Sequence, residues 1–242
     1  SRATPRRSFR RDLGALSRAV AVSFALGSAD AAAQVSGSLS VVSNYRYRGV
    51  TLSHNDPAAQ ATLVYDDPQG WYAGAFASSA RIGNPASNQA QGIFFAGYAW
   101  TASFGASFEA GAVYTGFTGP SSYAYPEVVV GATYDRISAR LHYSPNYYGR
   151  GSGAVYGEVD GTLRLHDHVQ AVAHVGVLWT DAQDYYGNSV DTVLDGRVGL
   201  VFDFTQLNVQ LSWVGINESS FGYGLTGVRS RNGPVLSLSW LF

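Results

Sequence analysis

Short segments in which apolar and polar residues alternate follow one another through most of this chain. The clearest case is residues 136–144, where Ile137, Ala139, Leu141 and Tyr143 alternate with polar or charged neighbours. Residues 155–165 repeat the pattern. A period of two indicates β-strands with one apolar and one polar face. The apolar residues are often small, which suits a lipid-facing surface better than a tightly packed core.

The connections between these segments alternate strictly between short and long. This parity is typical of outer-membrane barrels, which have short periplasmic turns and longer extracellular loops. A soluble sandwich has no reason to sort its loops in this way. The short connections are 66–70, 101–102, 135–136, 166–168 and 205–206, and the long ones are 49–56, 81–89, 117–123, 147–152, 181–189 and 218–225.

The pattern predicts an all-β fold, a transmembrane antiparallel up-and-down β-barrel of about twelve strands. An even number of strands places both ends of the barrel on the periplasmic side. The faces of the second to fourth strands are ambiguous, because neither is clearly polar. The expected strands are 35–48, 57–66, 70–80, 90–101, 103–116, 124–135, 136–146, 153–165, 168–180, 190–203, 206–217 and 226–242.

Composition narrows the class of protein. Charged residues make up 14% of the chain, against roughly 25% in soluble globular proteins, although a soluble β-sandwich shares much of this profile. The chain has no Cys, which excludes disulfides and thiolate metal sites. Its basic residues are all Arg, and from Gln34 onward 10 Arg face 15 Asp and Glu. This mildly acidic body argues against a nucleic-acid partner.

Residues 1–33 have the features of an export signal. Six Arg residues precede a short apolar run that begins at Ala19, and small residues end the segment at Ala33. This order predicts a signal peptide, cleaved after Ala33, and an outer-membrane barrel over 34–242. The apolar run is too short for a membrane-spanning helix, which needs about 20 residues.

Aromatic residues gather near the expected strand ends. Tyr and Trp favour the membrane–water interface, so they predict two girdles around the barrel. The last strand alternates toward Phe242 and resembles the C-terminal signal that the barrel-assembly machinery reads, carried by Leu236, Leu238, Trp240 and Phe242. The girdle candidates are Tyr45, Tyr47, Tyr65, Trp71, Trp100, Phe104, Tyr134, Tyr143, Trp179, Phe202, Trp213 and Trp240.

Charged residues on the polar face are the candidates for a functional lumen. In a water-filled pore they would tune solute selectivity; alternatively they pair with one another and partly close the barrel. Across one hairpin, Arg140 is expected to face Glu158 and Asp160. The candidates are Arg46, Arg48, Glu109, Glu127, Arg136, Arg140, His142, Glu158, Asp160, Arg164, His174, Asp195 and Arg197.

Other chemistry is weakly indicated. His142 and Ser144 resemble the pair of an outer-membrane lipid A deacylase, with Glu158 as a third member, but alternation points them into the lumen, away from lipid. Polar loop residues could hold a divalent cation, although solvated polarity is the simpler reading. We therefore expect no catalytic residues, no cofactor and no metal. The loop residues are His54, Asn55, Asp56, Asp181, Asp184 and Asp191.

Two stretches resemble a known family. They are residues 42–78, which include Asn44-Tyr45-Arg46-Tyr47-Arg48-Gly49, and residues 125–149, which include Tyr143-Ser144-Pro145-Asn146-Tyr147-Tyr148-Gly149. Both are similar to the TorF-type porins, a family of proteobacterial outer-membrane proteins. The resemblance implies a barrel and passive transport, and it supplies neither a substrate nor catalytic residues.

These observations favour a porin in the outer membrane of a Gram-negative bacterium, through which small hydrophilic solutes diffuse passively. Its expected partners are outer-membrane lipids, lipopolysaccharide, the barrel-assembly machinery and small solutes. A closed structural or surface barrel that acts through its external loops is the alternative. A lipid A-modifying enzyme is the third hypothesis.

Overall fold

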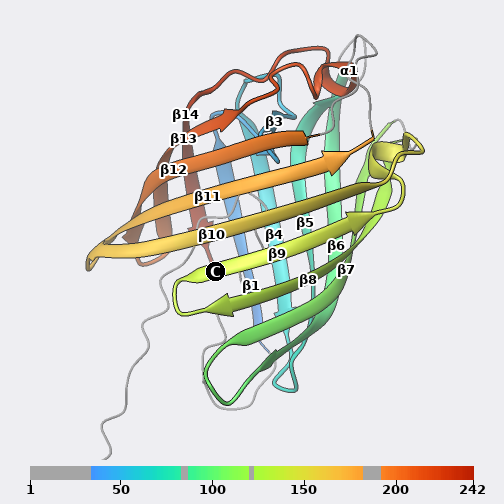
Figure 1. Cartoon of the computed structure of the whole chain (residues 1–242). Helices are drawn as coiled ribbons and strands as arrows, with labels where there is room; N and C mark the ends of the chain where they lie inside the picture. Colours follow the sequence, from blue (N-terminus) through green and yellow to red (C-terminus); the bar gives the residue numbers. More distant parts are fainter. Residues whose placement is uncertain (1–33, 83–86, 120–122, 182–191) are drawn as a thin grey trace, which may run out of the picture.

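The computed structural model describes residues 34–82, 87–119, 123–181 and 192–242, and these form a closed antiparallel β-barrel (Figure 1). The signal-peptide prediction for 1–33, and two candidate cation ligands, Asp184 and Asp191, lie outside these residues. The barrel strands are β1 (Gln34–Val42), β4 (Ala58–Asp66), β5 (Trp71–Ile82), β6 (Ser87–Thr101), β7 (Ser107–Phe117), β8 (Tyr125–Tyr134), β9 (Ile137–Ser144), β10 (Ala154–His166), β11 (Val169–Thr180), β12 (Thr192–Phe204), β13 (Leu207–Ile216) and β14 (Gly233–Leu241).

Each barrel strand pairs with its neighbours in sequence, and β1 pairs with β14 to close the ring. The prediction of twelve antiparallel strands is confirmed for the described residues. The first and last strands are shorter than predicted: β1 ends at Val42 rather than at residue 48, and β14 begins at Gly233 rather than at 226. We call the end with the short connections the turn end, and the opposite end the loop end.

The two faces of the barrel differ as the alternation predicts. In β9, Ile137 and Leu141 are exposed on the outside, whereas Ser138 and Arg140 are buried on the inside. Large apolar side chains, such as Trp213, Leu236 and Val198, are exposed on other strands all round the ring. An apolar outer surface of this kind suits contact with lipid. The closed ring also leaves no strand edge with unpaired backbone groups. Among the described residues, no helix is long and apolar enough to span a membrane.

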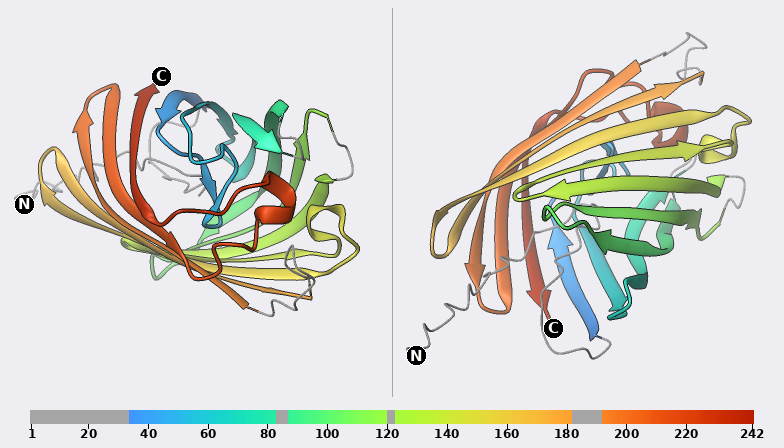
Figure 2. Two further views of the ribbon diagram at one scale, coloured as in Figure 1. Left: turned by 90° about the horizontal axis from the view of Figure 1, so that it is seen from above. Right: turned by 60° about the horizontal axis from the view of Figure 1, so that its bottom comes forward.

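The first long connection folds into the barrel instead of extending the first strand. Residues 43–57, which we call the inner loop, contain a small hairpin of β2 (Arg46–Tyr47) and β3 (Val50–Thr51). Seen from above, the loop lies within the ring of strands (Figure 2, left). Leu52 is 0% exposed and Tyr45 is 1% exposed. The loop is thus part of the barrel interior.

Apolar residues of the inner loop and of the barrel wall pack together at the loop end. Tyr45 and Leu52 belong to one cluster with Phe76 of β5 and Ile93 of β6. The rings of Tyr45 and Phe76 are 5.8 Å apart, and the Tyr45 hydroxyl donates to Gln91 Oε1 at 2.5 Å. These strands carry apolar side chains on their inner face because that face contacts the loop. This explains why the sequence pattern does not distinguish the inner face of these strands from the outer face.

A second connection, residues 217–232, contacts the inner loop from the loop end and contains the short helix α1 (Tyr223–Thr226). The backbone amide of Thr51 donates to Ser230 Oγ at 3.0 Å. Asn55 donates to the carbonyl of Arg229 at 3.2 Å, and Arg46 donates to the carbonyl of Arg231. The inner loop is therefore held between the barrel wall and this last connection.

Candidate functional site in the charged lumen

Eleven of the thirteen predicted lumen residues lie inside the barrel. Nine come from strands β7 to β12, whereas Arg46 and Arg48 come from the inner loop rather than from a strand face. The prediction is wrong for Arg136 and Arg164, which are exposed at the turn end. Arg136 lies in the tight turn between β8 and β9, and Arg164 donates to the carbonyl of Asp167 at 3.1 Å. Alternation alone does not show how deep in the barrel a residue lies.

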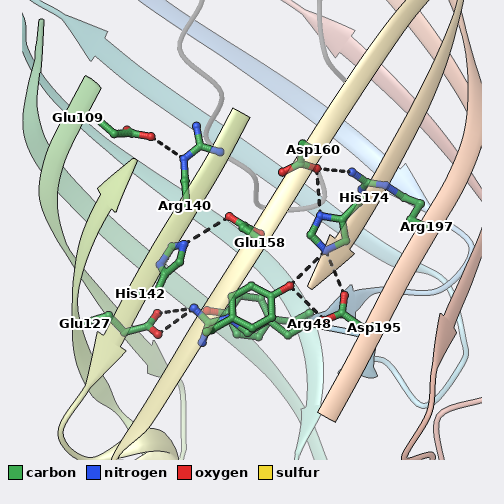
Figure 3. Close-up of polar contacts among 12 residues, drawn as sticks. Arg48, Glu109, Glu127, Arg140, His142, Glu158, Asp160, His174, Asp195 and Arg197 are labelled. Atoms are coloured by element: carbon green, nitrogen blue, oxygen red, sulfur yellow. Dashed lines mark hydrogen bonds and ion pairs between the residues drawn. The ribbon is translucent and has the colours of Figure 1, made fainter. Parts of the chain in front are cut away.

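Arg140 of β9 forms a buried ion pair with Glu109 of β7 (Figure 3). Its Nε lies 2.6 Å from Glu109 Oε1, and the Tyr72 hydroxyl donates to the same carboxylate at 3.2 Å. The pair crosses β8 above Gly131, which is in register with both residues. A Cβ at Gly131 would lie 2.9 Å from Glu109 Cγ and 3.1 Å from Arg140 Cγ. Because Gly131 has no side chain, the side chains of Arg140 and Glu109 can meet over β8.

The sequence predicts that Arg140 faces Glu158 and Asp160, and Glu158 does lie opposite it in register. Glu158 Oε1 instead lies 3.3 Å from His142 Nε2, and Asp160 contacts His174. The expected cross-hairpin pair is thus corrected to Arg140–Glu109. Within a barrel, inner side chains converge on the axis, so a long side chain can reach past the adjacent strand.

His174 of β11 lies between two carboxylates (Figure 3). Its Nδ1 is 3.0 Å from Asp160 and its Nε2 is 3.1 Å from Asp195. The Tyr156 hydroxyl contacts His174 Nε2 and Asp195, both at 3.1 Å, while Arg197 lies 3.6 Å from Asp160. The group forms a polar belt from β10 to β12.

Arg48 of the inner loop is buried against the opposite wall. Its Nη2 lies 2.8 Å and 3.0 Å from the two carboxylate oxygens of Glu127 on β8. Its guanidinium carbon lies 4.3 Å from the ring centre of Tyr156, 5.1 Å from Tyr47 and 5.5 Å from Tyr147. These distances are within the range of cation–π attraction. A carboxylate and three aromatic rings therefore surround this one cation.

Tyr147 and Tyr148 belong to the short 3-10 helix η2 (Tyr147–Gly149) between β9 and β10. Both side chains are buried, and their rings lie 4.6 Å apart. Burial raises the pKa of each phenol, that of Tyr148 well above its ordinary value, so both phenols stay neutral. Neither was among the predicted site residues, although both belong to the stretch that resembles the TorF-type porins.

A cavity of about 100 Å³ lies between the inner loop and the wall. This size allows a few water molecules, which the charged groups can hydrogen-bond. The cavity combines charge of both signs with aromatic surface, and it is lined by Arg48, Tyr72, Glu109, Arg140, Tyr156 and Asp195, among others.

The predicted girdle residues divide into three groups by exposure. Tyr45 and Tyr47 are not on the lipid-facing side, because the inner loop carries both into the interior. Phe202 is half-buried. The other candidates are exposed: Tyr65, Trp71, Trp100, Phe104, Tyr134, Tyr143, Trp179, Trp213 and Trp240.

The terminal residues also face outward. Leu236, Leu238, Trp240 and Phe242 are exposed, and the amide of Phe242 donates to the carbonyl of Gly37 at 3.1 Å. The last residue thus helps to close the ring. Recognition of this segment by the barrel-assembly machinery stays a prediction.

The geometry gives little support to the catalytic pair. Ser144 is buried inside the barrel, and His142 contacts Glu158 through Nε2, whereas its buried Nδ1 has no hydrogen-bond partner. The side chains thus point away from lipid. Glu158, Asp160 and His174 bring possible ligand atoms within 4.8 Å of one another, but these atoms pair with neighbouring side chains. The expectation of no metal stays a prediction.

Fold and interior together define a porin-like β-barrel. The chain belongs to the bacterial family described as a protein of unknown function, Gcw_chp, which it matches over residues 27–234. This match does not test the resemblance to TorF-type porins, which stays a prediction. No curated protein matches the chain.

Solved porins share the fold. The KdgM porin is 12% identical with a TM-score of 0.51, and the match covers 86% of this chain and 98% of that one. The NanC porin is 11% identical with a TM-score of 0.52, over 86% of this chain and 98% of that one. At this level of identity, the likeness concerns the architecture.

Proposed function

We propose that this protein is an outer-membrane channel for small hydrophilic solutes, narrowed by its inner loop. The observation that carries the proposal is an internal cavity lined by charged side chains of both signs together with aromatic and aliphatic ones, enclosed by a barrel whose outside is apolar. Charges inside a pore act directly on passing solutes. In this proposal the lipids of the outer membrane and lipopolysaccharide surround the barrel, and small solutes pass through it.

The fold of two porins supports this proposal. A second structure of KdgM is described as a complex with disordered oligogalacturonate, so a barrel of this architecture can take up a solute. In this chain, Arg side chains and carboxylates mix within the lumen. We therefore propose no strong preference for one sign of charge.

A closed surface barrel is the second candidate, because the inner loop and wall form an apolar cluster at the loop end. Single-channel recording of the mature chain, refolded into a planar bilayer, separates the two. The channel proposal predicts small but discrete conductance steps, together with slow uptake of a monosaccharide into liposomes. A correctly folded barrel that gives neither would favour the closed alternative.

The membrane location can be tested on the outer face. Val198 lies at the middle of β12 and Val35 near the turn end of β1, and both are exposed. In a bilayer, Val198→Arg should lower the free energy of unfolding by about 2–4 kcal/mol, whereas Val35→Arg should cost about 0–1 kcal/mol. Urea unfolding in lipid vesicles measures both. Equal costs at the two depths would contradict a membrane-spanning barrel.

A further inference from the structure

We propose that Glu127, Tyr147 and Tyr156 form a binding site for small organic cations with guanidinium or alkylammonium groups, and that Arg48 occupies this site here. We call these three wall residues the cation cage. The inference deepens the proposed channel function, on which it rests for the route by which a solute enters. Arg48 then acts as a latch that holds the inner loop in the barrel.

The chemistry of the cage selects a cation. Both oxygens of Glu127 contact one nitrogen of Arg48, at 2.8 Å and 3.0 Å. The faces of Tyr156 and Tyr147 lie near the same guanidinium. A carboxylate combined with aromatic faces is a recurrent arrangement for binding organic cations, because the negative ring faces attract positive charge that has been removed from water.

Two of the three cage residues, Tyr156 and Tyr147, have contacts outside the inner loop. The Tyr156 hydroxyl contacts His174 and Asp195. The amide of Tyr147 donates to the carbonyl of Ser152 at 2.8 Å, and its ring packs against Tyr125 at 5.0 Å. If the loop moved away, Tyr156 and Tyr147 would keep these contacts and Glu127 would stay on β8, so the cage would be open to a cation from the cavity.

Arg48 is an imperfect occupant of the cage. Its side chain is only 7% exposed, yet its Nη1 has no hydrogen-bond partner. Its backbone has a φ of 49°, in the left-handed region that residues other than Gly rarely adopt. Strain of this kind gathers at ligand clamps and switch regions. A free cation could satisfy the carboxylate without this strain, so it can compete with the latch.

Calorimetry on refolded protein in detergent tests the cage with methylguanidinium chloride as the probe, at constant ionic strength. Arg48→Ala empties the cage and should bind one equivalent. Adding Glu127→Gln should weaken that binding roughly tenfold or more, because a charge-assisted contact is lost. Arg136→Ala removes an exposed Arg at the turn end and keeps Arg48, so this control should bind the probe as weakly as the wild type and more weakly than Arg48→Ala. The proposal would be overturned if Arg48→Ala did not bind methylguanidinium, or if adding Glu127→Gln left the affinity unchanged.

The wild-type chain gives a test that needs no variant at the latch. Methylguanidinium should displace Arg48 and speed amide hydrogen exchange of residues 45–52, whereas an equal concentration of sodium chloride should not. Unchanged exchange would count against the latch. Both measurements are independent of transport. A barrel that binds the probe without conducting would refute the channel alone, and one that conducts without binding would refute the cage alone.

Discussion

Replacing residues 43–57 by a Gly-Asn-Gly-Ser turn should raise the single-channel conductance several-fold. Val42 and Ala58 are partners in the β1–β4 register, so a short hairpin turn can join these strands without changing the ring. The substitution removes Tyr45, Arg48 and Leu52 from the interior, which widens the path past the wall. Planar-bilayer recording, with liposome uptake of sugars of increasing size, measures the effect.

Arg81→Ala is a suitable control for this experiment. Arg81 forms an exposed ion pair with Asp56 at the rim of the inner loop, and exposed pairs of this kind contribute about 0–1 kcal/mol. The control should therefore conduct like the wild type. If the variant without the inner loop folds, closes its ring and still conducts no more than the wild type, the loop does not set the opening.

Glu109→Gln should lower the free energy of unfolding by about 3 kcal/mol, because the buried Arg140 loses the carboxylate that lies 2.6 Å from its Nε. Side-chain exposure is 6% for Arg140 and 10% for Glu109. Replacing both residues, by Glu109→Gln with Arg140→Met, should restore much of the loss, since the charge is then gone. Urea unfolding in lipid vesicles measures each variant.

An exposed carboxylate provides the comparison for this pair. Glu218 lies in the connection 217–232 and is exposed, so Glu218→Gln should change the free energy of unfolding by less than about 0.5 kcal/mol. If Glu109→Gln proved as mild as Glu218→Gln, the Arg140–Glu109 pair would not stabilise the barrel.

The strand count could be predicted from the sequence because most barrel strands show clear alternation and the connections alternate between short and long. The inner loop could not be predicted in the same way. Tyr45 and Tyr47 continue the period of two beyond Val42, and β2 is itself extended backbone, so the pattern does not mark where the ring ends. Only the inward apolar residues of β5 and β6 hinted that something fills the barrel.

The pairing of charges also escaped prediction, for a geometric reason. Register places Arg140 opposite Glu158, but Gly131 opens a path to Glu109 across β8. Gly176 acts in the same way across β11, where a Cβ would meet Asp195 Oδ2 at 2.6 Å. A glycine in a strand gains this meaning only when its neighbours on both sides are known.

Hydrogen exchange of the inner loop tests the central claim, that the first long connection fills the loop end of the barrel. The amide of Leu52 donates to the carbonyl of Tyr45 at 2.9 Å, and the amide of Tyr45 donates to Ser53 Oγ at 2.9 Å. Peptides that cover 43–57 should therefore exchange as slowly as strand peptides, and far more slowly than the turn residues 103–105, which are exposed. Exchange as fast as that turn would contradict the claim.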